Sequence, residues 1–162
     1  MNRKINKLLN AVTASLLSLL GFSSCDNGIF GGDEPCLYGT PTSSYHFKGT
    51  VTNEKGTPVK GIKVVAQEVY DGDTTRVDST YTDSNGNYQT ADKSVFSATG
   101  YVKEGRLFVS FEDVDGEDNG GEYETAKAVG SDISVKQIKK GDGSWDAGLY
   151  ELTADKKLNK KK

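Results

Sequence analysis

The strongest constraint on the fold is a period-two alternation of apolar and polar residues, which recurs in short segments along the chain. In YHFKGTVT, Tyr45, Phe47 and Val51 fall on one face, whereas His46 and other polar residues fall on the opposite face. Such alternation is typical of a half-buried strand. No segment after residue 24 has a sustained apolar period of 3.6 residues. The pattern therefore predicts an all-β fold.

Turn signals such as NEKGTP, DGD and DSNG separate these segments, which recur about every 8 to 12 residues, as in β-sandwiches. We expect an antiparallel β-sandwich of about seven strands over residues 44–153. Residues 91–105 carry no clear pattern. Two strands place the following residues inward: Ile62, Val64, Ala66, Leu107, Val109 and Phe111. Because large aliphatic residues are few, aromatic residues must fill much of the core: Tyr45, Phe47, Tyr81, Tyr88, Phe111 and Trp145.

The first 24 residues have the parts of a secretory signal. Basic residues precede a mostly apolar stretch over 8–20, and small residues precede Cys25. The apolar stretch is shorter than the roughly 20 residues that span a bilayer. LLGFSSC resembles the lipobox of bacterial lipoproteins, although Phe22 departs from the usual aliphatic residue. The resemblance implies cleavage before Cys25 and lipidation of its thiol. The alternative is an ordinary secretory signal that happens to end at a cysteine.

Lipidation would anchor the chain to the cell membrane or the outer membrane, facing the periplasm or the cell surface. Residues 25–43 are rich in glycine and proline, which predicts a flexible tether. If Cys25 carries lipid, Cys36 has no disulfide partner. The motif CLYGTP is then a candidate for recognition or modification by a partner, and its residues are Cys36, Tyr38, Gly39 and Pro41. The alternative is an unreactive thiol and a turn before the first strand.

The charge balance argues against nucleic-acid binding. Residues 1–24 contain three of the 20 basic residues and none of the 23 acidic ones, so the remainder has a net charge of −6. Phosphate binding needs lysine and arginine clustered on a folded face. Residues 154–162 (ADKKLNKKK) hold five lysines, and we expect them to form a disordered, solvated basic tail.

The segment DVDGEDNGGEYE is a candidate metal site because its carboxylates repel one another unless a cation neutralises them. Oxygen ligands from one loop suit Ca²⁺. The candidate ligands are Asp113, Asp115, Glu117, Asn119 and Glu122. The glycine positions differ from those of an EF-hand loop, and no flanking helices are expected. The alternative is a solvated loop between two strands.

Catalytic residues are scarce. The single histidine, His46, is expected on the exposed face of its strand without an adjacent nucleophile. One histidine and one free cysteine cannot complete a usual zinc site. We therefore expect no enzymatic activity and no cofactor apart from the calcium ion considered above. Trp145 and exposed tyrosines either stack on a glycan or pack at the edge of the core.

Two family resemblances add to this interpretation. FKGTVTNEKGTPVKGIKVVAQ followed by YTDSNGNYQT is similar to the carboxypeptidase regulatory-like domain, which implies a transthyretin-like, immunoglobulin-like sandwich. The matching residues are Gly49, Val51, Asn53, Gly56, Pro58, Gly61, Ile62, Val64, Thr82, Asp83, Gly86 and Tyr88. The lipobox, CLYGTP, FEDVDGEDNGGE and GDGSW together resemble the radical SAM-associated lipoproteins of Bacteroidetes, which implies a radical SAM enzyme as a partner.

These observations lead to two functional hypotheses. The first is a lipid-anchored, non-catalytic accessory or binding module of the envelope that is a partner or substrate of a radical SAM enzyme. The second is a surface lipoprotein that binds a glycan or an envelope protein and takes calcium in its acidic loop.

Overall fold

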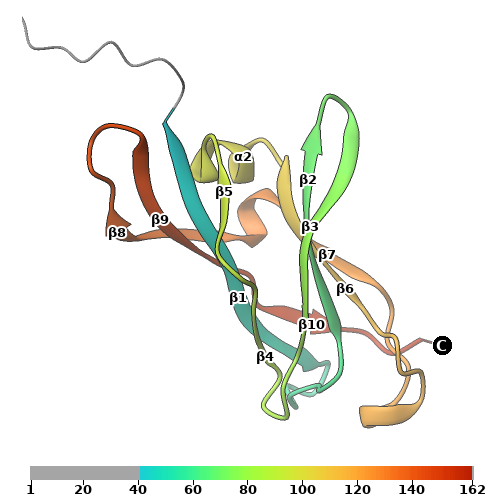
Figure 1. Cartoon of the computed structure of the whole chain (residues 1–162). Helices are drawn as coiled ribbons and strands as arrows, with labels where there is room; N and C mark the ends of the chain where they lie inside the picture. Colours follow the sequence, from blue (N-terminus) through green and yellow to red (C-terminus); the bar gives the residue numbers. More distant parts are fainter. Residues whose placement is uncertain (1–40, 162) are drawn as a thin grey trace, which may run out of the picture. The chain divides into compact units, whose positions relative to one another are not determined.

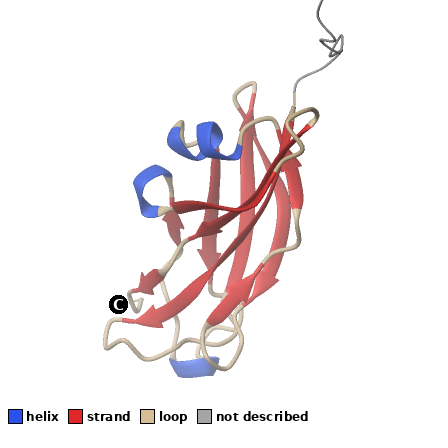
Figure 2. Ribbon diagram, turned by 90° about the vertical axis from the view of Figure 1, so that its left-hand side faces the viewer, coloured by secondary structure: helices blue, strands red, loops and turns tan. Residues whose placement is uncertain are grey.

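A computed structural model describes residues 41–161, in which strands dominate and short helical turns lie at the ends of the strands (Figures 1 and 2). The β-sandwich prediction is confirmed. The described residues contain ten strands: β1 (Thr42–Asn53), β2 (Lys63–Tyr70), β3 (Asp73–Tyr81), β4 (Asn87–Gln89), β5 (Lys93–Val95), β6 (Leu107–Glu112), β7 (Ala126–Ala128), β8 (Ser134–Lys140), β9 (Asp146–Thr153) and β10 (Lys156–Leu158). The helical segments are α2 (Ala98–Lys103), η1 (Asp118–Gly120) and η2 (Gly130–Asp132).

The strands form two sheets. One contains β10-β1-β9-β8, with β4 and β5 also paired to β1, and the other is ordered β3-β2-β6-β7. The count exceeds the predicted seven because β4, β5, β7 and β10 have only three residues each, too few to show an alternating pattern. The strands are not all antiparallel, since β1 pairs in parallel with both β9 and β10.

The core lies between the sheets and contains every residue predicted inward on β2 and β6. Tyr45 and Phe47 pack edge to face with ring centroids 5.9 Å apart. The prediction was wrong for Tyr81 and Trp145, which are 56% and 43% exposed. Tyr81 ends the outermost strand of its sheet, and Trp145 precedes β9 in a hairpin, so neither position is covered by the opposite sheet.

Side-chain hydrogen bonds fix the turn between β3 and β4. The Thr82 hydroxyl donates to the carbonyl of Val59 (2.7 Å), and Asp83 accepts from the backbone N–H groups of Asn85 and Asn87. Gly86 has φ +73°, which favours glycine, and a Cβ there would lie 2.4 Å from a carbonyl oxygen of β1. These residues therefore fix the hairpin geometry.

The segment without a clear pattern contains α2. Ser97 caps this helix, since its hydroxyl accepts the N–H of Gly100 at 3.1 Å. Tyr101 and Val102 are buried in the core. The helix has only six residues, so its three buried residues, which include Ala98, are too few to establish a helical period in the sequence.

The predicted disordered tail is wrong for residues 154–161. β10 pairs with the end of β1, and Leu158 is 1% exposed. Beyond β10, the backbone of Lys160 forms an isolated antiparallel β-bridge with Tyr123, and the Lys161 N–H donates to the carbonyl of Glu122. The lysine-rich sequence does not predict this strand, because Leu158 is its single apolar residue. At the other boundary, β1 begins at Thr42, inside the predicted tether.

Candidate functional site

The outer face of the six-stranded sheet carries a row of polar side chains across three strands. Lys48 of β1 lies opposite Gln89 of β4 on one side and Thr153 of β9 on the other. Residues directly opposite each other in paired strands project to the same face. The next pair along β1, Thr50 and Asn87, continues the row.

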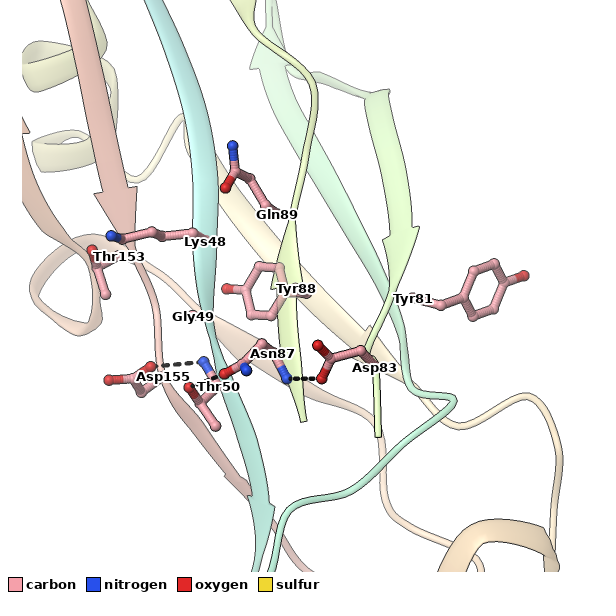
Figure 3. Close-up of a pocket in the computed structure, with 10 residues that line it drawn as sticks. All are labelled: Lys48, Gly49, Thr50, Tyr81, Asp83, Asn87, Tyr88, Gln89, Thr153 and Asp155. Atoms are coloured by element: carbon pink, nitrogen blue, oxygen red, sulfur yellow. Dashed lines mark hydrogen bonds between the residues drawn. The ribbon is translucent and has the colours of Figure 1, made fainter. Parts of the chain in front are cut away.

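This row borders an open pocket of about 470 Å³ (Figure 3). Its lining is Lys48, Gly49, Thr50, Tyr81, Asp83, Asn87, Tyr88, Gln89, Thr153 and Asp155. Most of these residues are polar, and the ring of Tyr81 points away from the other residues drawn (Figure 3).

Hydrogen bonds fix part of this lining. The Thr50 N–H donates to Asp155 at 2.8 Å, and the Thr50 hydroxyl donates to the side-chain oxygen of Asn87 at 3.0 Å. The side chains of Gln89 and Thr153 make no hydrogen bond to another residue within 41–161. Two polar groups therefore lie in the pocket with their hydrogen-bonding capacity free.

Tyr88 forms the inner wall of the pocket. Its hydroxyl donates a 2.7 Å hydrogen bond to the carbonyl of Ala154, and its ring packs edge to face on Phe111. Burial raises the pKa of Tyr88 well above its ordinary value, and the negative charge of Asp155 adds to this effect. The phenol therefore stays protonated at neutral pH and holds the backbone beside the pocket.

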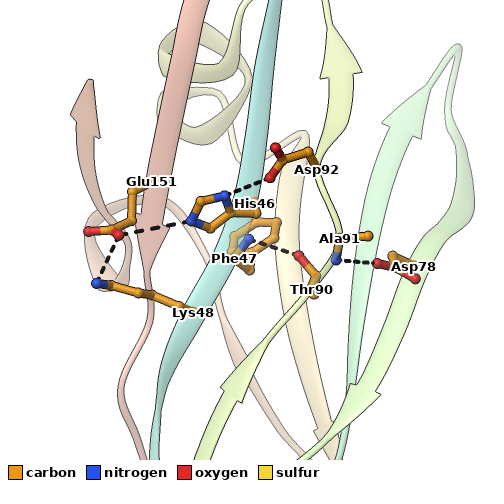
Figure 4. A network of polar contacts seen from close by, with 8 residues as sticks. All are labelled: His46, Phe47, Lys48, Asp78, Thr90, Ala91, Asp92 and Glu151. Atoms are coloured by element: carbon orange, nitrogen blue, oxygen red, sulfur yellow. Dashed lines mark hydrogen bonds and ion pairs between the residues drawn. The ribbon is translucent and has the colours of Figure 1, made fainter. Parts of the chain in front are cut away.

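A second polar group adjoins the pocket through Lys48 (Figure 4). His46 Nδ1 lies 2.9 Å from Asp92 Oδ1, and its Nε2 lies 3.9 Å from Glu151 Oε2. Lys48 Nζ lies 2.8 Å from the same oxygen of Glu151. The hydrogen bond from Lys48 lowers the pKa of the Glu151 carboxyl, which favours its ionised form.

The prediction that His46 is exposed was wrong, because its relative accessibility is 6%. The connection between β4 and β5 lies beside this part of β1. Thr90 accepts the N–H of Phe47 at 2.9 Å, and the N–H of Ala91 donates to Asp78 of β3 at 2.9 Å. This connection therefore joins β1 to the opposite sheet and brings the carboxylate of Asp92 to the imidazole (Figure 4). Both recorded polar partners of the ring are carboxylates, which orient it.

The candidate calcium ligands lie in one loop but engage other groups. Asp113 accepts backbone N–H groups from Tyr123 (2.8 Å) and Asp115 (3.2 Å). Partial burial works to raise the pKa of Asp113, but these hydrogen bonds outweigh it and leave the pKa below its ordinary value. Asp115 accepts from the amide of Asn119, and this hydrogen bond closes the loop on itself.

The remaining two candidate ligands are Glu117 and Glu122. Glu117 is exposed at the start of η1, and Glu122 pairs with Lys161. Within residues 41–161, no three side chains of His, Cys, Asp or Glu are grouped so that they can hold a metal ion. The structure thus lends the calcium site no support.

The predicted lipidation and modification residues lie mostly outside the described part of the chain. Cys25, Cys36, Tyr38 and Gly39 precede residue 41, whereas Pro41 is exposed and directly precedes β1. A search of the described helices finds none that is both long and apolar enough to cross a bilayer.

Fold and site together define an all-β sandwich with a polar pocket on the outer face of its larger sheet. The chain belongs to a family described as a domain of unknown function (DUF6795), whose model matches residues 47–141. This match spans β1 to β8. No curated protein sequence matches the chain.

Three solved structures illustrate what the fold is similar to. Catechol 1,2-dioxygenase from Acinetobacter radioresistens is 14% identical, with 98% of this chain and 70% of that chain covered and a TM-score of 0.48. The dioxygenase domain of a carbohydrate-binding fusion protein from Streptomyces sp. SirexAA-E is 14% identical (84% and 98% covered, TM-score 0.47). 3-Chlorocatechol 1,2-dioxygenase from Rhodococcus opacus 1CP is 15% identical (91% and 78% covered, TM-score 0.45).

These neighbours correct one expectation. The sequence predicts a protein without enzymatic activity. The comparison contradicts that prediction, because the similar structures are enzymes. At 14–15% identity and TM-scores below 0.5, the likeness concerns the fold alone and assigns no reaction to this chain.

Proposed function

We propose that this chain is a lipid-anchored protein of the bacterial envelope whose sandwich binds a hydroxylated ligand of the saccharide class. The observation that carries the proposal is the polar pocket on the outer face of the larger sheet, with the free side chains of Gln89 and Thr153. The lipid at Cys25 would hold the domain at the envelope, where saccharides are abundant.

The chemistry of the pocket favours this class of ligand. Pockets for drug-sized molecules are usually lined mainly by apolar and aromatic side chains, whereas most of the residues that line this pocket are polar. An amide such as that of Gln89 both donates and accepts, and a threonine hydroxyl does the same. Sugar hydroxyls also donate and accept, so such a lining can pair with several hydroxyls at once. A volume of about 470 Å³ lies within the range of small-ligand sites, which is about 300–1,000 Å³.

Binding to an array of envelope and plant glycans, followed by calorimetry on any hit, tests the ligand class. We expect Gln89→Ala and Thr153→Val each to weaken binding by about 1 kcal/mol, roughly fivefold, because each removes a hydrogen bond. Asn159→Ala is the matched control, since Asn159 is exposed outside the pocket. Equal affinity for all four proteins would contradict the proposal, and so would the absence of any glycan hit.

The anchor is tested by intact-mass measurement of the native protein. Lipidation predicts a chain that begins at Cys25 and carries acyl chains. More than one chain is needed for stable anchoring, because a single acyl chain holds a protein only marginally. A freely soluble native protein with Cys25 and Cys36 joined in a disulfide would contradict lipid anchoring.

A radical SAM enzyme as a partner is a second candidate, favoured by the position of CLYGTP. Pro41, the last residue of the motif, is exposed directly before β1. A partner that recognises the motif would therefore reach it beside a folded domain. Intact masses of the protein produced with and without a co-expressed radical SAM enzyme test modification at Cys36 or Tyr38. Identical masses would contradict modification.

A further inference from the structure

Two exposed aromatic side chains flank the residue at which the domain begins. The N–H of Thr42 donates to the carbonyl of Trp145 at 3.0 Å, so the β8–β9 hairpin lies on one side of β1. On the other side, Ser43 pairs with Val95, and Phe96 follows directly. Trp145 and Phe96 are 43% and 55% exposed.

The arrangement places both aromatic residues at one end of the sandwich. Adjacent strands lie about 4.8 Å apart, so the backbones on either side of β1 are separated by roughly 10 Å. The β8–β9 hairpin, the β5–α2 connection and the start of β1 lie at the same end, and η1 lies at the other end (Figure 1). We call Trp145 and Phe96 the aromatic pair.

Charged groups of both signs lie near the aromatic pair. Lys139 and Lys140 are exposed at the end of β8, where the hairpin begins. The hairpin also has two carboxylates, which keep their negative charge and accept hydrogen bonds from its own backbone. Asp142 accepts from Ser144 at 2.8 Å, and Asp146 accepts from Gly148 at 2.7 Å.

We propose that this end of the domain docks on the surface of a lipid bilayer, with the aromatic pair at headgroup depth. Tryptophan and other aromatic rings concentrate at membrane interfaces, and lysines are attracted to anionic headgroups. The proposal rests on the anchor at Cys25 in the proposed function. Thr42 follows Cys25 by 17 positions, so even a fully extended connection keeps the aromatic pair within about 60 Å of the bilayer. Docking would leave the sheet face that bears the pocket free for its ligand.

The single tryptophan of the chain makes the test direct, because Trp145 is the only source of tryptophan emission. The chain from residue 25, with Cys36→Ser, is coupled through the Cys25 thiol to a maleimide lipid. The vesicles contain phosphatidylcholine and phosphatidylglycerol, with or without brominated lipids. This coupling supplies the anchor artificially, so the result does not depend on whether Cys25 is lipidated in the cell.

Docking predicts a blue shift of Trp145 emission and its quenching by the brominated lipids. Phe96→Ser should lower the quenched fraction at least about twofold, because it removes half of the inserted apolar surface. The matched control is Val114→Ser, which removes an exposed apolar residue (53% exposed) from the acidic loop before η1, at the opposite end. Absence of quenching in the tethered wild-type chain would overturn docking and leave the ligand-binding proposal untouched. Equal effects of the two substitutions would also overturn it.

Discussion

The hydroxyl of Tyr88 and the carbonyl of Ala154 are joined by a 2.7 Å hydrogen bond that links β4 to the residue just after β9. This bond lies beneath the pocket, so the geometry of the proposed binding face depends on it. A second buried phenol, that of Tyr45, has no hydrogen-bond partner within residues 41–161. The two tyrosines therefore provide a matched comparison.

Tyr88→Phe should lower the free energy of unfolding by about 1 kcal/mol, because it leaves a buried carbonyl without its donor. Tyr45→Phe should leave the stability unchanged or raise it slightly, because its hydroxyl is buried without a partner in the described structure. Urea denaturation of the two variants checks the comparison. Equal destabilisation would show that the hydroxyl of Tyr88 is not a structural contact.

The buried imidazole of His46 gives a second prediction. His46→Ala should destabilise the fold by about 1–3 kcal/mol, since it removes a buried ring from its packing and from its contact with Asp92. Asp92→Ala should have a smaller effect, because that carboxylate side chain is 60% exposed and solvent can replace its contact. If His46→Ala were as stable as the wild type in thermal unfolding, the structural role of the buried imidazole would be contradicted.

The C-terminal strand can be tested in the same way. Leu158→Ala should lower the free energy of unfolding by about 2–5 kcal/mol, as expected for a fully buried leucine. Lys157→Ala, at an exposed position of the same strand, is the control and should have little effect. Indistinguishable denaturation curves for the two variants would mean that the chain end is not part of the core.

The lowered pKa of Asp113 predicts that the stability of the fold depends on pH. Its pKa is lowered in the folded protein, so its contribution is fully present above the ordinary pKa of an aspartate, about 3.9, and is lost as the pH falls through the folded-state value. Asp113→Asn should therefore reduce the loss of stability between pH 5 and pH 2. Denaturation midpoints over this range, compared with those of Asp118→Asn in the exposed part of the loop, provide the measurement. Parallel pH profiles of wild type and Asp113→Asn would contradict this role.

The sequence predicted the fold class and most of the core because long strands such as β1, β2 and β6 have enough residues to display their alternation. It missed β10 and α2, since segments of three and six residues carry too little pattern. It also missed the pocket. Lys48 and Thr153 are far apart in the chain and meet only through the parallel pairing of β1 and β9, which nothing in the local sequence encodes.

The acidic loop shows another limit of the sequence. Its carboxylate spacing is compatible with a cation site, but the sequence does not show which backbone N–H groups the same carboxylates bind. In the structure, Asp113 accepts from the backbone N–H groups of Tyr123 and Asp115, and these hydrogen bonds stabilise the loop. Composition therefore identified an unusual loop but not its contacts.

The central claim is that a saccharide binds to the outer face of the larger sheet. The most direct measurement is amide chemical-shift mapping by NMR during titration with a saccharide that the glycan array identifies. We expect the largest shifts at Lys48, Asn87, Gln89 and Thr153, with the Trp145 indole signal unchanged. Shifts centred on Trp145, or no shifts at saturating saccharide, would contradict the claim.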